Sequence, residues 1–347
     1  PSGRWVAWVS KFVDYWKATD PRRVYTGASV GNSWQWQPHN EYHVKAGARG
    51  LSWAGAQPES ESDYRARIDT VKQPYVSHET GQWCVFPNFN EIRKYTGVNK
   101  AKNFEIFRDI LNDNHMGGQS YDFMMASGKL QALCYKHEIE KTLRTPDYAG
   151  FQLLALNDYS GQGTALVGVL DVFFEEKGYI NAEQFRRFCS PTVPLARIPK
   201  FVYANNETFH ADIEVSHFGA APLESAKTVY TIKDKFGKVY AHGTVGTHHI
   251  PIGNLYSLGS VDMTLEGIDT QQKLNLEVRI EGCDAVNDWD FWVYPAQVEL
   301  VQGTVYTTDT LDAKALAVLQ DGGNVLITAA GKIQYGKEVK HYFTPVF

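Results

Sequence analysis

The sequence predicts a chain of several domains, in which an α/β segment precedes an antiparallel β-sandwich and a second, shorter α/β segment. Three observations support this fold class. The length of 347 residues exceeds one ordinary domain. Helical and extended patterns alternate up to about residue 190, and short strands with alternating polar and apolar residues follow from 201 to about 294. We therefore expect domains close to 1–190, 195–300 and 301–347.

The first segment is expected to form a parallel sheet wrapped by helices. Residues 4–18 place aromatic and aliphatic side chains at helical spacing, which predicts a strongly amphipathic helix. The strands that follow end in polar residues and have helices between them, which is typical of a parallel sheet. The predicted strands are 23–26, 41–46, 75–78 and 151–156, and the further helices are 62–71, 100–112 and 127–143.

The rest of the chain changes character twice. Short alternating strands at 209–215, 227–232 and 273–280, separated by turn signals, predict an antiparallel sandwich. On the strand around 289–294, one aromatic face is expected to be core, and the other is an interface with the first domain or a carbohydrate platform. Residues 314–328 then form one helix and one strand. A single unit cannot bury both faces of a parallel strand, so we expect it to begin a further α/β domain.

Composition excludes several classes of partner. A net charge of −5 gives no reason to expect nucleic acid or an anionic membrane. No apolar run approaches the roughly 20 residues of a membrane span. The four cysteines include no C-x-x-C pair and are expected to be buried thiols. We expect neither a metal nor a cofactor.

Glu79 is the first residue that needs a chemical explanation. It ends the short strand that begins at Tyr75 and lies close to Gly81. A carboxylate at the carboxyl end of an apolar strand is costly unless it is paired or functional, and catalytic groups of α/β barrels lie at that end. The alternative is a helix-capping or salt-bridged carboxylate. Strand alternation predicts Ser77 and Glu79 on one face and His78 on the other.

Two other patterns lack what their chemistry requires. Residues 27–31 fit G-x-S-x-G, but a nucleophile elbow needs a helix directly afterwards and a Trp-rich loop follows instead. His39 and His43 are four residues apart, yet no third zinc ligand accompanies them. A serine hydrolase and a zinc site are therefore disfavoured.

The residues around Glu79 carry a family resemblance. Residues 75–81 resemble the nucleophile strand of family 2 glycoside hydrolases, the β-galactosidase and β-glucuronidase group. Residues 8–23 are similar to the helix and Asp-Pro turn after the acid/base strand of that family, and 88–91 through 162–168 resemble large members from gut Bacteroidetes. The resemblance implies that 1–190 is the second half of a TIM (β/α)8 barrel, that the sandwich is Ig-like, and that the protein is periplasmic or secreted.

The resemblance also assigns roles. Retaining enzymes of this kind use two carboxyl groups about 5 Å apart, one as nucleophile and one as acid/base. Glu79 would be the nucleophile, and the acid/base glutamate would precede Pro1, so the chain alone is expected to be inactive without the N-terminal remainder of the enzyme. The implied activity is β-galactosidase-like release of non-reducing-end sugars from plant or host oligosaccharides. β-Glucuronidase specificity, or a non-catalytic carbohydrate-binding or scaffold protein with a degenerate barrel, are the alternatives.

Aromatic and polar side chains in the predicted loops are candidates for binding the sugar. For the ring-bearing residues in the loops at 34–53, the alternative role is packing between loops. For the two residues at 158–159, after the last predicted barrel strand, the alternative role is to hold a loop in place. The candidates are Trp34, Trp36, His43, Trp53, Asp158 and Tyr159.

Overall fold

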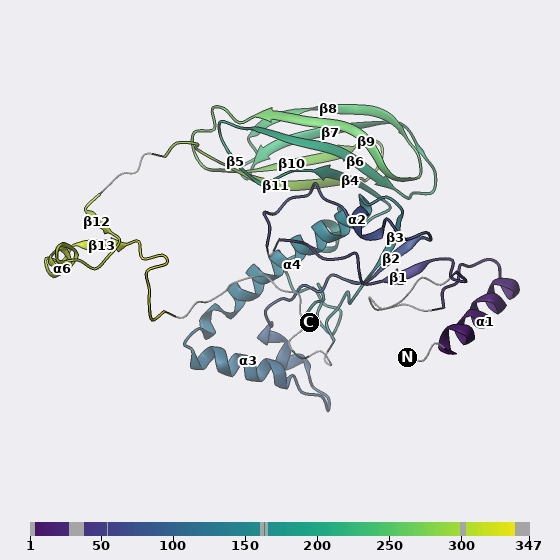
Figure 1. The fold of residues 1–347 in the computed structure, drawn as a ribbon, viewed down its shortest axis with the longest axis horizontal. Helices are drawn as coiled ribbons and strands as arrows, with labels where there is room; N and C mark the ends of the chain where they lie inside the picture. The colour runs from purple at the N-terminus through teal and green to yellow at the C-terminus, as the bar shows by residue number, and fades with distance from the viewer. Residues whose placement is uncertain are drawn as a thin grey trace.

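The computed structural model describes residues 4–27, 38–53, 55–159, 163, 166–298 and 303–336. In these ranges the chain is rich in β-structure and forms four separate sheets. Figure 1 shows a β-sandwich stacked on an α/β region, with a small third unit set apart from both.

A three-stranded parallel sheet lies at the centre of the α/β region. Strands β1 (His43–Lys45), β2 (Tyr75–Thr80) and β3 (Tyr148–Leu153) pair in the order β1-β2-β3. The parallel arrangement predicted from the alternating pattern is confirmed. The helices of this region are α1 (Arg4–Thr19), α2 (Arg65–Ile68), η1 (Phe89–Lys94), α3 (Lys102–Asp113), η2 (Gly117–Gln119), α4 (Ser120–Leu143) and α5 (Ala182–Arg186).

The predicted half of a TIM barrel is not shown by the structure. Half a barrel would need four parallel strands, and the described residues form an open parallel sheet of three. The strand predicted at 23–26 is wrong. The backbone of Tyr25 pairs with Glu41 at one point: the Tyr25 N–H donates to Glu41 Oε2 at 2.9 Å, and the Glu41 N–H donates to the Tyr25 carbonyl at 3.0 Å. One such exchange fixes a loop and does not continue a ladder.

Helix α1 leaves most of its aromatic face uncovered. Its predicted helical pattern is confirmed, and Val13 is buried. Trp8, Phe12 and Tyr15, however, are 67%, 57% and 60% exposed. The helix lies at one end of the α/β region (Figure 1). Groups of large exposed aromatic side chains are typical of interaction surfaces.

The sandwich packs a five-stranded sheet, β5-β11-β10-β7-β8, on a three-stranded sheet, β4-β6-β9. Its core includes Phe209 and Phe291, whose rings stack with centroids 4.1 Å apart. Trp289, Phe291 and Val293 are buried, so the prediction that one face of this strand is core is confirmed. The strands are β4 (Thr192–Arg197), β5 (Val202–Ala204), β6 (Thr208–His217), β7 (Leu223–Asp234), β8 (Val239–Ile250), β9 (Gly253–Thr264), β10 (Gln272–Ile280) and β11 (Val286–Tyr294).

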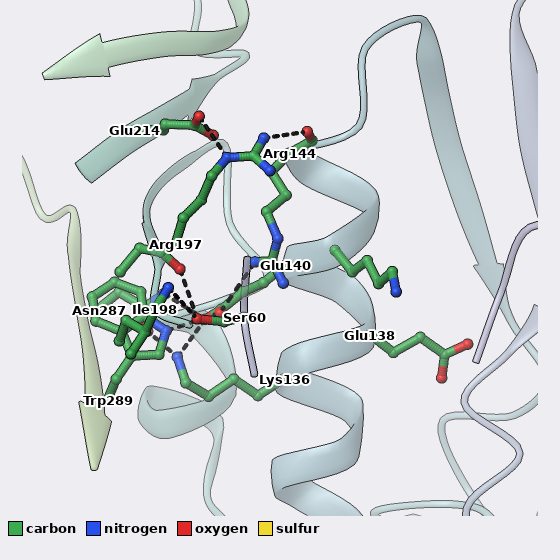
Figure 2. Close-up of polar contacts among 12 residues, drawn as sticks. Ser60, Lys136, Glu138, Glu140, Arg144, Arg197, Ile198, Glu214, Asn287 and Trp289 are labelled. Carbon is green, nitrogen blue, oxygen red and sulfur yellow. Dashed lines mark hydrogen bonds and ion pairs between the residues drawn. The ribbon is translucent and has the colours of Figure 1, made fainter. Parts of the chain in front are cut away.

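Buried charges join α4 to the sandwich (Figure 2). Glu140 accepts hydrogen bonds from the Trp289 indole at 2.9 Å and from Asn287 Nδ2 at 2.7 Å. It also pairs with Lys136 and lies 3.9 Å from Arg144 Nη1. These side chains come from one helix and one sandwich strand, so the two regions share a polar core.

A second group of contacts closes the same junction. Arg197 of β4 donates to Glu214 Oε1 at 2.7 Å and to the Arg144 carbonyl at 3.1 Å. Ser60 lies in the α/β region, and its Oγ donates to the Ala196 carbonyl at 2.9 Å. The sandwich is therefore held by the helix end and by the loop before α2, both from the α/β region.

The third unit consists of β12 (Val305–Thr308), α6 (Ala313–Gln320) and β13 (Asn324–Ile327). The two strands pair in parallel, so the unit holds one strand more than the sequence predicted. Asp312 caps α6 by accepting the Ala315 N–H at 2.7 Å. Leu316 and Leu326 are 46% and 54% exposed, as expected for a sheet too small to bury its own apolar faces. In the described part of the chain, no helix is both long and apolar enough to cross a membrane.

Candidate active site at the carboxyl edge of the parallel sheet

The carboxyl ends of β1, β2 and β3 bring charged groups to one edge of the sheet. Arg49 follows β1, Glu79 lies near the end of β2, and Asp158 follows β3. Parallel strands present their carboxyl ends on the same side, which is where α/β folds place ligand-binding groups. The candidate site is built on this edge.

Glu79 adopts a backbone conformation that is unusual for its residue type. Its φ angle is 55°, in the left-handed region, which costs a residue with a Cβ roughly 1–2 kcal/mol. Its carboxylate lies 3.5 Å from Arg49 Nη1 and accepts a hydrogen bond from Gln82 Nε2 at 3.2 Å. The side chain is 38% exposed, so it is held by polar neighbours and open to solvent. Strain of this kind is concentrated at functional sites.

The strained residue also changes which side chains meet. Alternation predicted that His78 would face away from Glu79, and that prediction is wrong: His78 Nε2 lies 3.5 Å from Glu79 Oε1. The left-handed turn at Glu79 ends the regular alternation and swings its side chain toward its neighbour. His78 Nδ1 lies 3.3 Å from Gln152 Oε1 on β3. Ser77 instead is buried, with its Oγ 2.5 Å from Thr80 Oγ1.

Arg49 fixes the end of β2 through the backbone as well as through the carboxylate. Its Nη1 donates to the carbonyls of His78 and Glu79, both at 2.7 Å. An isolated arginine in a loop carries no motif, so Arg49 could not be singled out from the sequence. Its partner lies thirty residues away in sequence, so only the pairing of β1 with β2 brings the two together.

Gly81 allows the chain to pass close to α4. Its φ is +83°, and a Cβ at this position would lie 2.0 Å from the Tyr135 ring, so no other residue fits without a shift. The Tyr135 hydroxyl lies 2.8 Å from the Gly81 carbonyl and 2.7 Å from the Val167 carbonyl. Burial raises the pKa of Tyr135, which keeps the hydroxyl available as a donor. The turn after Glu79 is thus fixed by packing and by polar contacts.

A buried carboxylate on α4, Glu138, lies beneath the same turn. It accepts the Gly81 N–H at 3.2 Å and the Trp83 indole N–H at 2.7 Å through Oε2, and the Gly50 N–H at 2.7 Å through Oε1. Burial raises the pKa of Glu138, and the three donors oppose that rise. Glu138 carries no signal in the sequence either, because a glutamate inside a helix is usually exposed to solvent.

Two predicted sugar-binding residues are enclosed by the chain itself. His43 is buried at the start of β1, and burial, with a smaller contribution from Lys45, lowers its pKa to about 4. Trp53 is partly buried against the apolar cores of both the α/β region and the sandwich, and its ring lies 4.8 Å from that of His137. These positions favour packing, the alternative reading of the loop aromatics.

The two residues after β3 differ from each other. Asp158 is buried, with Oδ2 2.5 Å from Lys177 Nζ and Oδ1 accepting the Gly168 N–H at 2.8 Å. Burial raises the pKa of Asp158, and Lys177 offsets part of that rise. This placement favours the loop-holding role. Tyr159 is 48% exposed and is available to a ligand. Trp34 and Trp36 lie outside the described residues.

A large cavity lies elsewhere, between α4, α5 and the sandwich. It has a volume of about 870 Å³, and its walls include Trp53, Leu133 and Trp292 but neither Glu79 nor Arg49. Trp292 therefore faces the α/β region. This agrees with the predicted interface between the sandwich and the first domain, which was one of the two alternatives for this strand face. Within the described ranges, no three His, Cys, Asp or Glu side chains gather closely enough to hold a metal ion.

Comparison with known proteins gives distant likenesses. A family model described as "Domain of unknown function (DUF8488)" matches residues 207–295, inside the sandwich. None of the curated proteins matches the chain. An FMN-binding β-glucuronidase from Facaelibacterium prausnitzii L2-6 is similar at 10% identity and a TM-score of 0.30, over 87% of this chain and 40% of that one.

Two further solved structures are comparable. A β-glucuronidase of Bacteroides uniformis is similar at 10% identity and a TM-score of 0.30, over 88% of this chain and 32% of that chain. The CARDB domain of a Pyrococcus furiosus protein, in complex with di-metal ions, is similar at 16% identity and a TM-score of 0.23, over 30% and 93% of the two chains. The chain spans less than half the length of either glucuronidase. At such scores, the function of the site has to be argued from its own residues.

Proposed function

We propose that this chain carries the nucleophile of a retaining β-glycosidase site and that Glu79 is that nucleophile. The observation that supports it most is the conformation of Glu79: a strained, half-exposed carboxylate at the carboxyl edge of a parallel sheet, held by Arg49, His78 and Gln82. A carboxylate whose only role was a salt bridge would not require a left-handed backbone. Strain that the surroundings maintain is expected where a group must point at a substrate.

The proposed chemistry needs two carboxyl groups. A Glu79 oxygen attacks the anomeric carbon while the bond from that carbon to the leaving oxygen breaks, and the acid/base carboxyl group protonates that oxygen. Water, deprotonated by the same acid/base group, then releases the sugar from Glu79. Arg49 and Gln82 orient the nucleophile through their contacts with its Oε2. Tyr159, with Trp34 and Trp36, would contact the sugar.

We propose further that the acid/base group comes from a partner segment that completes a TIM barrel, of which β1 to β3 form part. The aromatic face of α1, with Trp8 and Phe12 exposed, supports this, because a barrel helix normally covers that face against its neighbours. The 347-residue chain alone is then expected to release no aglycone. The substrate would be an oligosaccharide met in the periplasm or outside the cell.

The test uses the intact enzyme, in which this chain is joined to its partner segment. A 2-fluoro-glycoside with a good leaving group should label Glu79 covalently, as peptide mass spectrometry would show. Glu79→Gln should remove the label and lower kcat by several orders of magnitude, while Glu183→Gln, a control at an exposed position on α5, should retain both. Label on another residue would refute the assignment.

The same assay separates the remaining alternatives. Aryl β-galactosides as substrates would establish the β-galactosidase-like specificity, and aryl β-glucuronides the other. If neither substrate turns over and no residue is labelled while oligosaccharide still binds, the protein is a non-catalytic carbohydrate-binding protein and the proposal fails.

A further inference from the structure

We propose that Glu138 of α4 is a positioning residue for the candidate site, because it ties together the two loops that carry Arg49 and Glu79. This inference rests on the proposed function, in which Glu79 is the nucleophile. It goes further by assigning the geometry of that nucleophile to a carboxylate that touches no substrate.

The contacts of Glu138 reach both loops at once. Its Oε1 accepts the N–H of Gly50, the residue after Arg49, at 2.7 Å. Its Oε2 accepts the N–H of Gly81, two residues after Glu79, at 3.2 Å. The indole N–H of Trp83 donates to the same oxygen at 2.7 Å. A single side chain thus fixes the loops after β1 and β2 relative to each other.

A carboxylate suits this position better than any neutral side chain. All three partners of Glu138 are donors, and an ionised carboxylate is an acceptor at both oxygens. A glutamine would turn its NH₂ group toward the donors on one side, and an apolar residue would leave the buried N–H groups of Gly50 and Gly81 without this acceptor. Burying a charge is costly unless it is fully hydrogen-bonded. The three hydrogen bonds to the Gly50 and Gly81 loops offset that cost for Glu138.

The neighbouring carboxylate Glu140 provides a matched control. Two residues along a helix correspond to a rotation of about 200°, so Glu138 and Glu140 point to nearly opposite sides of α4. Figure 2 shows Glu138 directed away from the cluster in which Glu140 meets Asn287 and Trp289. Both carboxylates are buried, but only one reaches the site.

The test compares Glu138→Gln with Glu140→Gln in the intact enzyme. A misplacement near 1 Å can cost about 100-fold in rate, so Glu138→Gln should lower kcat roughly 10- to 100-fold, with KM changed less than about 3-fold. Glu140→Gln should melt earlier yet keep the wild-type kcat below its melting point. Equal kcat losses in the two variants would show a merely structural role and overturn the inference.

A second measurement does not depend on activity. In the 347-residue chain, hydrogen exchange at the amides of Gly50 and Gly81 should be faster in Glu138→Gln than in the wild type, and unchanged in Glu140→Gln at a temperature where both are folded. Wild-type exchange at both amides would overturn the inference. If Glu79 proves not to be the nucleophile, the exchange rates still show whether Glu138 holds the two loops in place.

If Glu138→Gln does not fold, Glu138→Asp takes its place. Aspartate keeps the charge but is one methylene shorter, so it cannot reach both loops together. We expect it to fold and to lower kcat about 10-fold, on the same scale for misplacement. Wild-type kcat and exchange in this variant would contradict the positioning role.

Discussion

Glu91 of η1 is a buried carboxylate that lacks a full set of partners. Its Oε2 has no hydrogen-bond partner within the described residues. Burial raises its pKa to about 7, and the nearby Asp171 adds to the rise while Lys177 opposes it. The folded state therefore holds a proton on Glu91 at pH values where the unfolded chain has lost it.

This gives stability a predictable pH dependence. Because the folded pKa lies above the unfolded one, the contribution of Glu91 is complete below about pH 4.5 and is lost as pH rises through 7. Between pH 5 and 8 the free energy of unfolding should fall by about 2 kcal/mol from this group. Urea unfolding at a series of pH values measures it.

Glu91→Gln is the control for that measurement. The amide cannot ionise, so the difference in unfolding free energy between wild type and variant should change between about pH 4.5 and pH 7 and be constant on either side of that range. A pH-independent difference between the two proteins would assign the effect to other groups.

A residue of the candidate site could be singled out from sequence only where a local pattern marks it. Glu79 is recognisable because it ends a strand next to a turn. Arg49 and Glu138 contribute through partners that are tens of residues away, so no window of sequence contains the contact. The left-handed φ of Glu79 was also beyond local rules, since the surrounding loops impose it against the preference of the residue.

At the scale of elements, α4 is unusual in burying charge on two sides. Although burial alone would raise the pKa of Glu140, the pKa lies below its usual range because Lys136, His137 and Arg144 surround it. Breaking a buried ion pair by removing one partner costs about 3–5 kcal/mol, since the other charge is left uncompensated.

Glu140→Gln is therefore expected to lower the free energy of unfolding by roughly 3 kcal/mol, because Lys136 and Arg144 would lose their shared anion. Denaturant unfolding checks this value. The exposed pair between Lys227 and Glu281 offers the comparison, and Lys227→Gln should cost less than about 1 kcal/mol. Similar losses in both variants would contradict the view of α4 as the polar core of the junction.

The elements themselves were partly readable in the sequence. Strands of the sandwich alternate strictly because one face is buried and the other is wet, so β6 and β10 were placed within two residues of their bounds. Helix α4 begins seven residues earlier than the predicted 127, because Gly117, Gly118 and Gly128 lie around its first turns and weaken the helical pattern there. The predicted helix 62–71 shrinks to α2, whose Tyr64 N–H is held by Thr145 Oγ1 instead of a helical carbonyl.

At the scale of the whole molecule, the three units are not equally independent. The unit of β12, α6 and β13 stands apart from the others (Figure 1), whereas the sandwich shares buried charges with α4. The sandwich was predictable because its pattern is local to each strand. The extent of any barrel was not, because closure depends on strands that pair across long sequence distances.

Truncations test this ranking. A chain ending at residue 298 should melt at the same temperature as the full chain, because the hydrogen bonds and ion pairs of residues 303–336 in the described part of the chain stay within the last unit. A chain ending at residue 190 should fail to give a cooperative transition, since Glu140 and Lys136 would lose Asn287 and Trp289. Calorimetry distinguishes the two outcomes, and a lower melting temperature on removal of the last unit would contradict the prediction.

The polar junction between α4 and β11 also restricts how this chain can exchange parts with others in evolution. Along the backbone, the connection at 187–191, between α5 and β4, is a natural place for recombination. In space, a foreign sandwich would have to supply an amide where Asn287 lies, an indole where Trp289 lies and a guanidinium where Arg197 lies. The sandwich and the face of α4 that carries Lys136 and Glu140 should therefore be inherited together. Substitutions on one side of this junction should be accompanied by substitutions on the other.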